Sequence, residues 1–336
     1  MPRPIILDCT GDRLTADEAA LFRALDPYGF ILFARHVRDP EQVRRLISEL
    51  RESVGREAPV LIDQEGGRVA RLGPPHWRKP PAAGRFAELA TRDRGAARRA
   101  AWLNSRLIAG ELGELGITVD CLPVLDLRLP GAHLIIGDRA YGTTPEEVID
   151  LARAAAEGLM AGGVLPVAKH VPGHGRATAD SHLELPRVDA SRAELEATDF
   201  VPFRALKDLP IAMTAHVTYT AIDPDRPATL SPTVIGDVIR GHMGFRGALI
   251  SDDLTMKALN GPLPDLARQA LAAGCDALLL CNAAFDDRRA VLEAVAPLDD
   301  AALAHLDRHF TPPPRQDHDL AAVTAELAAL MGTAFA

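Results

Sequence analysis

Eight short apolar runs, each followed by a polar or Gly-rich loop and then by a segment with helical periodicity, limit most strongly what this chain can fold into. Most of the runs are unbroken rather than alternating, which is typical of parallel strands that are buried on both faces. A sheet of parallel strands connected by helices is therefore expected. The runs occupy residues 4–7, 29–33, 60–63, 117–121, 165–168, 211–215, 248–251 and 277–281.

The segments between the runs carry helix signals. Thr15 precedes an acidic first turn, and Asp39-Pro40 and Thr144-Pro145 place a capping side chain before a proline at the first helical position. Eight strand–loop–helix units predict a single TIM-like (β/α)8 barrel domain over residues 1–336. A doubly wound open sheet is the alternative, but the CTGDR turn after the first run lacks the GxGxxG pattern of that fold. The predicted helices cover residues 15–25, 39–53, 96–115, 144–161, 191–206, 231–240, 264–273 and 286–295.

The charge and the apolar segments restrict the partners and the compartment. The formal net charge is −9, so nucleic acid and anionic membranes are not expected to bind. No segment approaches the roughly 18 apolar residues of a membrane span, and the start MPRPIILDCTGD lacks a signal-peptide core. The four cysteines form no CxxC pair, which favours reduced core thiols. We expect a cytoplasmic protein, either a monomer or a weak homo-oligomer.

Charged and titratable residues follow the predicted strands where barrel enzymes carry their active sites. Buried strand ends rarely hold carboxylates that have neither a partner nor a task. Each residue also has a structural interpretation: Asp63 could cap the next segment, Arg139 could pair with Asp138 or a neighbouring carboxylate, and His216 could be a satisfied polar residue lining the site. Five strands nevertheless deliver such groups to one rim, namely Asp63, Arg139, Lys169-His170, His216 and Asp252-Asp253.

The segment KHVPGHGRATADSHLELP, residues 169–186, concentrates three histidines, a lysine and an aspartate in a stretch too rich in Gly and Pro for a helix. A carboxylate such as Asp252 could attack an anomeric carbon while a protonated group donates to the leaving oxygen. His182 can act as acid and then as base near neutral pH, and Asp180, two residues away, could orient its ring. This predicts glycosidic chemistry with a histidine in place of the second carboxyl.

These residues resemble glycoside hydrolase family 3, and specifically its single-domain bacterial β-N-acetylglucosaminidases of the NagZ type. KHxPGHG followed by DSH is highly specific to this group, and SDDLTM at the seventh run is nearly as specific. The similarity runs in family order from about residue 29 to 282 and implies a TIM-like barrel. The matching segments are GFILFARHV, LIDQEGGRVARL, LPVLDL, GDRAY, AKHVPGHGRATADSHLELP, MTAHVTY, ALISDDLTMKAL and AGCDALLLCN.

The resemblance implies roles that spacing alone does not assign. Asp252 matches the nucleophile, a choice over Asp253 that spacing could not make, while His182 matches the general acid/base and Asp180 its partner. The implied reaction is exo-acting, retaining release of GlcNAc from GlcNAc-1,6-anhydro-MurNAc muropeptides in peptidoglycan recycling, with no metal or organic cofactor. The residues that match those binding the non-reducing GlcNAc are Asp63, Arg71, Arg139, Lys169 and His170.

The chain departs from the family pattern at four positions, and other functions also fit part of the sequence. The changed positions bear on substrate preference rather than on reaction class. One competitor is a metal-dependent hydrolase with His170, His174, His182 and Asp252 as ligands, although the HxH after the first strand is missing. Others are an inactive sugar-binding barrel and a family phosphorylase or β-glucosidase. We expect His174 to be structural. The departures are Val171, Thr255, Lys257 and Asp138.

Overall fold

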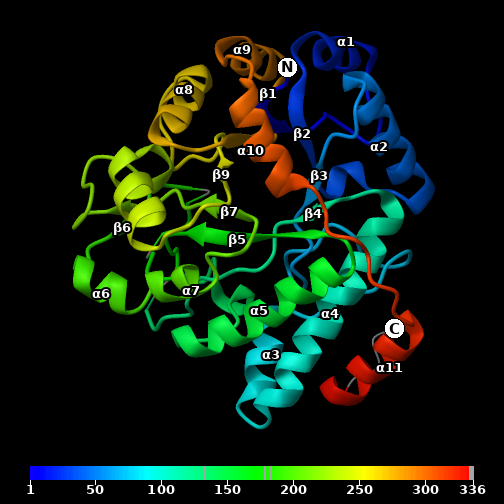
Figure 1. Ribbon diagram of the computed structural model, residues 1–336, viewed down its shortest axis with the longest axis vertical. Coiled ribbons are helices and arrows are strands. Elements are labelled where there is room, and N and C mark those ends of the chain that lie inside the picture. The colour runs from blue at the N-terminus through cyan, green and yellow to red at the C-terminus, as the bar shows by residue number, and fades with distance from the viewer. Residues whose placement is uncertain (132, 178, 182, 333–336) are drawn as a thin grey trace.

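The computed structural model describes residues 1–131, 133–177, 179–181 and 183–332, and its centre is a closed barrel of eight parallel strands (Figure 1). The order around the barrel is β1-β10-β9-β7-β5-β4-β3-β2, so strands that are successive along the chain lie side by side. This confirms the (β/α)8 prediction and excludes the open sheet. The strands are β1 (Arg3–Leu7), β2 (Pro27–Leu32), β3 (Val60–Ile62), β4 (Val119–Asp120), β5 (Leu165–Val171), β7 (Ile211–Thr214), β9 (Ala248–Asp253) and β10 (Ala277–Leu280).

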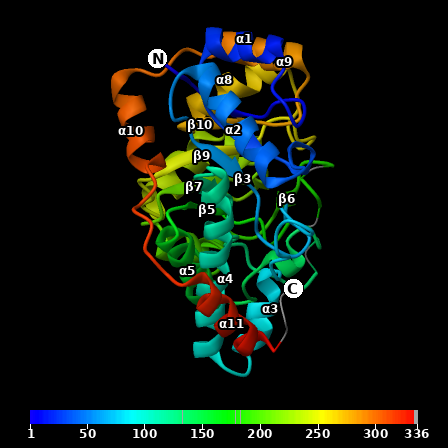
Figure 2. The same cartoon turned by 90° about the vertical axis from the view of Figure 1, so that its right-hand side faces the viewer.

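Helices surround the barrel, and Figure 2 shows them stacked along its outside. The long pair α4 and α5 pack against each other, and the C-terminal helix α11 lies along α4. The helices are α1 (Ala16–Leu25), α2 (Pro40–Val54), α3 (Ala83–Ala90), α4 (Arg94–Leu115), α5 (Pro145–Ala161), α6 (Arg192–Ala197), α7 (Phe200–Ala205), π-helix η4 (Val234–His242), α8 (Leu263–Ala273), α9 (Phe285–Ala294), α10 (Asp300–Phe310) and α11 (Leu320–Met331), with short 3-10 turns η1 (Ala34–His36), η2 (Gly137–Arg139) and η3 (Ala228–Leu230).

The helix starts follow the capping chemistry expected from the sequence. Thr15 accepts from the backbone N–H of Glu18, whose side chain reaches back to the Thr15 backbone, which is a complete capping box. Thr144 forms the same box with Glu147, and Asp39 caps α2 by accepting from the N–H of Gln42. Each cap satisfies backbone donors that a helix start would otherwise leave unpaired.

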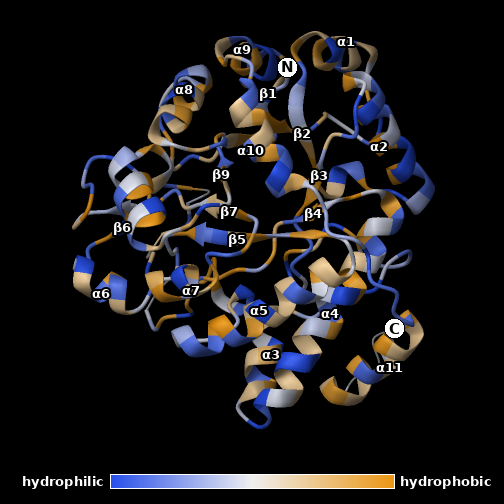
Figure 3. Ribbon diagram, in the orientation of Figure 1, coloured by the Kyte–Doolittle hydropathy of each residue, from blue (hydrophilic) through white to orange (hydrophobic). Residues whose placement is uncertain are grey.

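Two apolar layers hold the barrel together. One lies between the strands and the helices, and the hydropathy colouring of Figure 3 shows helices with hydrophobic and hydrophilic residues on different faces. The other fills the barrel and continues into α10, where the Phe310 ring meets the Tyr28 ring edge-on at 5.3 Å. Helix α10 therefore closes the barrel at the end where β2 begins, and the site lies at the opposite end.

Three helical segments differ from the prediction. Residues 191–206 form two helices rather than one, because Asp199 between them is held by Arg176 (Nε–Oδ2 2.6 Å) and Pro202 suits a first helical turn. The helices α3 and α10 were not predicted. A two-stranded parallel sheet of β6 (Arg187–Val188) and β8 (Thr218–Tyr219) also joins the loops after β5 and β7.

All four cysteines are buried and free, as expected for core thiols. Over the part of the chain that the structure describes, none of the helices has both the length and the apolar character that crossing a bilayer requires.

Candidate active site

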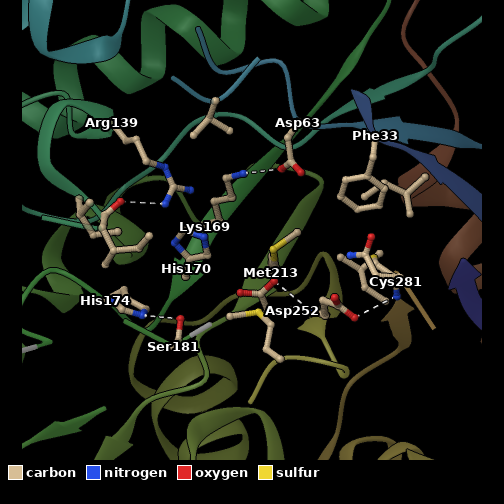
Figure 4. Close-up of a pocket in the computed structure, with 18 of the residues that line it drawn as sticks. Phe33, Asp63, Arg139, Lys169, His170, His174, Ser181, Met213, Asp252 and Cys281 are labelled. Carbon is tan, nitrogen blue, oxygen red and sulfur yellow. Dashed lines mark hydrogen bonds and ion pairs between the residues drawn. The ribbon is translucent and has the colours of Figure 1, made fainter. Parts of the chain in front are cut away.

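A pocket of about 280 Å³ opens at the ends of the strands where the sequence places its polar residues (Figure 4). Its lining combines apolar side chains, among them Phe33, Met213 and Met256, with charged ones, and the Arg71 guanidinium lies 5.5 Å from the Phe33 ring centroid. Six of the eight predicted site residues line this pocket together: Asp63, Arg71, Arg139, Lys169, His170 and Asp252.

Two irregularities in strand pairing explain why consecutive residues face the same pocket. Lys169 and Val171 of β5 pair with successive residues of β7, so His170 is an extra residue in β5. Ile250 and Asp253 of β9 are three residues apart but pair with residues of β10 that are two apart, so β9 also has one extra residue. Such bulges redirect side chains that would otherwise alternate between the two faces of a strand. Lys169 with His170, and Asp252 with Asp253, therefore all line the pocket.

A buried charge network forms one wall. The Lys169 Nζ lies 2.9 Å from Asp63 Oδ1 and 2.6 Å from Glu65 Oε1, and Arg71 Nη2 lies 2.9 Å from Asp63 Oδ2. Arg139 grips Glu65 with two hydrogen bonds of 2.8 Å. Burial opposes charge on both carboxyls, but these cations hold the pKa of Glu65 down to about 2 and that of Asp63 well below its usual range.

Glu65 is a site residue that the sequence reasoning missed. It stands two residues after Asp63, and this spacing in an extended segment places both side chains on the same side, which was an available signal. Of the carboxylates considered as partners of Arg139, Asp138 is not the one used, because it accepts from Arg68 Nε at 2.9 Å; Arg139 pairs with another nearby carboxylate, Glu65.

Glycines allow the loop after β3 and the loop after β5 to approach neighbouring segments closely. Gly66 has a φ of +103°, and a Cβ there would collide with the carbonyl oxygen of Pro81. A Cβ at Gly175 would likewise collide with the carbonyl oxygen of Leu127. The GG of the first loop and the final glycine of PGHG are therefore required by packing.

Asp126 organises two histidines, His170 within β5 and His174 in the loop after it. Its Oδ2 lies 2.7 Å from His170 Nδ1, and its Oδ1 accepts from the backbone N–H of His174 at 2.6 Å. The carboxylate fixes the proton on His170 Nδ1, so that Nε2 is the nitrogen left for a ligand. The sequence reasoning quoted the LPVLDL segment but gave Asp126 no part in the site.

The structure distinguishes Asp252 from Asp253, which spacing could not do. Asp253 is held on several sides: its carboxylate accepts from Cys281 N (2.9 Å), Thr255 N (3.0 Å) and Thr255 Oγ1 (2.7 Å). Within the described residues, the Asp252 carboxylate accepts one hydrogen bond, from the N–H of Asp253 at 2.8 Å. Asp252 thus keeps oxygen lone pairs available to a ligand.

The charge state of the two aspartates also differs. Burial opposes ionisation of Asp252, yet the imidazoles of His216 and His170 outweigh it and lower its pKa. Burial raises the pKa of Asp253 to about 6. His216 bonds the Asp253 carbonyl (2.9 Å) and Thr229 Oγ1 (2.7 Å), so it is the satisfied polar residue that the structural interpretation anticipated.

Asp120 is a second carboxyl that the sequence reasoning overlooked. It is fully buried at the end of β4, and its Oδ1 accepts from the N–H of Gln64 at 2.9 Å. Burial raises its pKa to about 8, so the carboxyl is mostly protonated at neutral pH beneath the charge network.

The two remaining predicted residues belong to the loop after β5. His182 lies outside the described residues. Asp180 is half-buried, and its carbonyl accepts from the N–H groups of Leu183 (2.9 Å) and Glu184 (3.0 Å). His174, expected to be structural, is buried at the pocket wall with its Nε2 3.1 Å from Ser181 Oγ (Figure 4).

Comparison with known proteins gives the family. Residues 10–310 match the Glycosyl hydrolase family 3 N terminal domain, which is most of the chain. The chain belongs to glycosyl hydrolase family 3. The family resemblance drawn from the motifs is thereby confirmed, and with it the class of enzyme, a glycoside hydrolase.

Relatives within glycosyl hydrolase family 3 agree in sequence and structure. A Beta-hexosaminidase of Alkalilimnicola ehrlichii is 46% identical over 285 residues, covering 83% of this chain and 80% of that protein. One of Tolumonas auensis is 41% identical over 290 residues, with 83% of each covered. The crystal structure of NagZ from Neisseria gonorrhoeae in complex with N-trifluoroacetyl-D-glucosamine superposes with a TM-score of 0.88, at 34% identity over 98% of each chain.

The described part of the pocket combines a carboxylate with charged groups that suit a sugar ring. An ionised carboxylate faces a small enclosed space, and charged hydrogen-bonding groups opposite it can hold a sugar ring through its hydroxyls. Arg71, Lys169 and Arg139 carry three positive charges against the two negative charges of Asp63 and Glu65, which leaves one net positive charge beside Asp252.

Proposed function

We propose that the protein is an exo-acting, retaining β-N-acetylglucosaminidase that releases non-reducing terminal GlcNAc from GlcNAc-1,6-anhydro-MurNAc muropeptides in the cytoplasm. The Asp252 carboxylate carries this proposal: it is ionised, accepts a single hydrogen bond within the described residues, and faces an enclosed polar pocket. The relatives support GlcNAc as the sugar, since one is a Beta-hexosaminidase and the NagZ crystal structure holds N-trifluoroacetyl-D-glucosamine.

In the proposed mechanism, Asp252 attacks C1 of the GlcNAc residue and forms a glycosyl ester. His182, oriented by Asp180, protonates the leaving oxygen and then acts as base toward the water that cleaves the ester. The mechanism needs neither a metal nor an organic cofactor.

The charge network is the proposed clamp for the sugar. Asp63 accepts hydrogen bonds from sugar hydroxyls, and so does His170 through Nε2, while Arg71, Arg139 and Lys169 donate to hydroxyl or carbonyl oxygens. Exo action requires that these side chains close one end of the pocket, so that it admits a terminal sugar residue and excludes one in the middle of a chain. A histidine acid suits a lactyl-bearing leaving group, because a carboxylate acid would repel its negative charge.

The test compares aryl β-glycosides of GlcNAc and of glucose, with and without phosphate, and then the GlcNAc-anhydro-MurNAc disaccharide. We expect hydrolysis of the GlcNAc substrates, with at least about 100-fold preference over glucose, and β-GlcNAc as the first product by proton NMR. Preference for glucose would contradict the proposed sugar, and α-GlcNAc as first product would contradict retention. Accumulation of GlcNAc-1-phosphate would make the protein a phosphorylase, and loss of activity with a strong chelator would favour a metal-dependent hydrolase.

A further inference from the structure

The loop that joins β5 to β6, residues 172–186 and here called the β5 loop, is held through its described residues by two neighbouring loops and by one contact within itself. The N–H of His133, from the loop after β4, donates to the carbonyl of Ala177 at 2.9 Å. The N–H of Ala258, after β9, donates to the carbonyl of Ser181 at 3.2 Å. His174 Nε2 lies 3.1 Å from Ser181 Oγ. Two of these contacts meet at one residue, Ser181.

Ser181 is buried, although the described residues Leu183 and Glu184 that come after it are exposed. Its exposed fraction is 3%, whereas that of Leu183 is 66%. Ser181 also lines the pocket with Asp252 (Figure 4). A residue held through both its carbonyl and its side chain has little freedom in its own backbone.

His174, which holds the Ser181 hydroxyl, is itself fixed. Its backbone N–H donates to Asp126, the same carboxylate that orients His170. Burial lowers the pKa of the His174 imidazole to about 4, so the ring stays neutral across the neutral range and its contact with Ser181 does not depend on pH there. A chain of contacts therefore runs from Asp126 through His174 to Ser181.

We propose that Ser181 is a positioning residue: by its contacts with His174 and Ala258 it fixes the β5 loop so that the next residue, His182, can transfer a proton to the leaving oxygen opposite Asp252. This inference rests on the proposed function, because it assigns no chemistry to Ser181 itself. Proton transfer is sensitive to misplacement of the donor by about 1 Å, so a loosened loop should lower the rate without removing the acid.

Leaving-group dependence is the diagnostic measurement. Departure of 3,4-dinitrophenolate from a GlcNAc glycoside needs little protonation, whereas departure of 4-methoxyphenolate needs a well-placed acid. General acid catalysis contributes about 10²–10⁴-fold, so a partial loss is expected. For Ser181→Ala we expect kcat/KM on the 4-methoxyphenyl glycoside to fall about tenfold or more, and kcat/KM on the dinitrophenyl glycoside to stay within about twofold.

Azide provides a second readout that a purely structural role would not affect. Hydrolysis of the glycosyl ester needs a base to activate water, while azide attacks without one. Azide should therefore raise kcat of Ser181→Ala on the dinitrophenyl glycoside and yield the β-glycosyl azide, with little effect on the wild type.

Three further variants make the test decisive. His174→Ala removes the other partner, and if the contact carries the effect, the double variant should be no worse than the more impaired single variant. Ser53→Ala is the matched control, because Ser53 is a buried serine that donates to the Leu50 carbonyl (2.6 Å) in α2, away from the pocket. Thermal unfolding of each variant checks that it is folded at the assay temperature.

The His182→Ala variant distinguishes a failure of the positioning role from a failure of the proposed acid assignment. If His182→Ala shows strong leaving-group dependence while Ser181→Ala matches the wild type, the positioning role is wrong and the acid assignment stands. If His182→Ala loses activity equally on both glycosides, the acid assignment itself is wrong. Equal losses on both glycosides for Ser181→Ala alone would reduce the residue to a structural role.

Discussion

Glu65 and Lys169 approach within 2.6 Å (Oε1–Nζ), and both side chains are almost fully removed from solvent. Glu65 also accepts two hydrogen bonds from Arg139, so this single carboxylate pairs with two buried cations that face the pocket. Burial of a cation is unfavourable unless an anion and hydrogen bonds compensate it. The wall of the pocket thus depends on Glu65 although Glu65 itself lies behind the groups proposed to contact the sugar.

Replacing Glu65 with glutamine should be costly for this reason. Removing one partner of a buried ion pair destabilises a protein by about 3–5 kcal/mol, since a buried charge is left uncompensated. We expect Glu65→Gln to lower the free energy of unfolding by that amount and to raise KM through a displaced Arg139 and Lys169. Urea unfolding and steady-state kinetics measure the two effects.

Asp138→Asn is the matched control for Glu65→Gln. Asp138 pairs with Arg68 on the same side of the pocket, but their side chains are 52% and 43% exposed, and exposed pairs contribute about 0–1 kcal/mol. The pH dependence supplies a further check. Because the pKa of Glu65 is lowered to about 2, its stabilisation is present above its ordinary value of 4.5 and is lost as pH falls toward 2. The stability difference between wild type and Glu65→Gln should shrink over that range; a constant difference would contradict the assigned pairing.

The sequence predicts the barrel because parallel strands buried on both faces leave unbroken apolar runs, and eight such runs separated by helical patterns admit few folds. It also predicts which residues gather at one rim, because all strands of such a barrel end on the same side. The residues predicted at strand ends that line one pocket are Asp63, Arg139, Lys169, His170, Asp252 and Asp253, and Arg71, which only the family resemblance implied, lines it too.

The sequence could not supply the pairing between these residues. Asp126, Glu65 and Asp120 have roles that depend on which side chain lies opposite, and this follows from strand register and bulges rather than from local pattern. The break near Asp199 likewise depends on Arg176, a residue 23 positions away. Helix α10 was not predicted because the contact that places it, between Phe310 and Tyr28 at the end of the barrel, joins residues far apart in the sequence.

Asp252 and Asp253 should respond differently to the same substitution. Asp252→Asn removes the proposed nucleophile, so turnover should fall by at least about 10⁴-fold while the unfolding temperature stays near that of the wild type. Asp253→Asn weakens the hydrogen bonds to Thr255 and Cys281, so it should cost about 1–3 kcal/mol of stability and retain measurable turnover.

Covalent trapping tests directly whether Asp252, rather than Asp253, is the nucleophile. A slow 5-fluoro GlcNAc substrate should accumulate as an ester, and fragmentation of the labelled peptide should place the sugar on Asp252. An ester on Asp253, or a folded Asp252→Asn variant with wild-type turnover, would reverse the assignment.

Phe310 tests whether closure of the barrel by α10 is separate from catalysis. Its ring is 5% exposed and packs on Tyr28 at the end of the barrel opposite the pocket. Phe310→Ala should lower the free energy of unfolding by about 3–5 kcal/mol through loss of buried surface and a residual cavity. Below its unfolding temperature, kcat/KM should remain within about twofold of wild type.

The control is Phe285→Ala, at a half-buried ring beside Arg289, which should destabilise the protein less than Phe310→Ala does. A larger destabilisation by Phe285→Ala would mean that α10 contributes little to the core.

Asp120 should make the protein less stable as pH rises through neutrality. Its pKa is raised from 3.8 to about 8 by burial, so the folded state retains a proton that the unfolded chain has released. A carboxyl with a raised pKa contributes stability that is present below about pH 4 and is lost as pH rises toward 8. In Asp120→Asn the amide oxygen can still accept from Gln64, but the side chain has no proton to lose.

The unfolding temperature of Asp120→Asn, relative to wild type, should therefore increase between pH 5 and pH 8 by roughly 2 °C or more, since 1 kcal/mol corresponds to about 2–4 °C in a large domain. Asp138→Asn, at an exposed carboxyl, should show no such trend. A difference between Asp120→Asn and wild type that stays constant over this range would mean that Asp120 is ionised in the folded protein, and that Lys169 neutralises it together with Asp63 and Glu65.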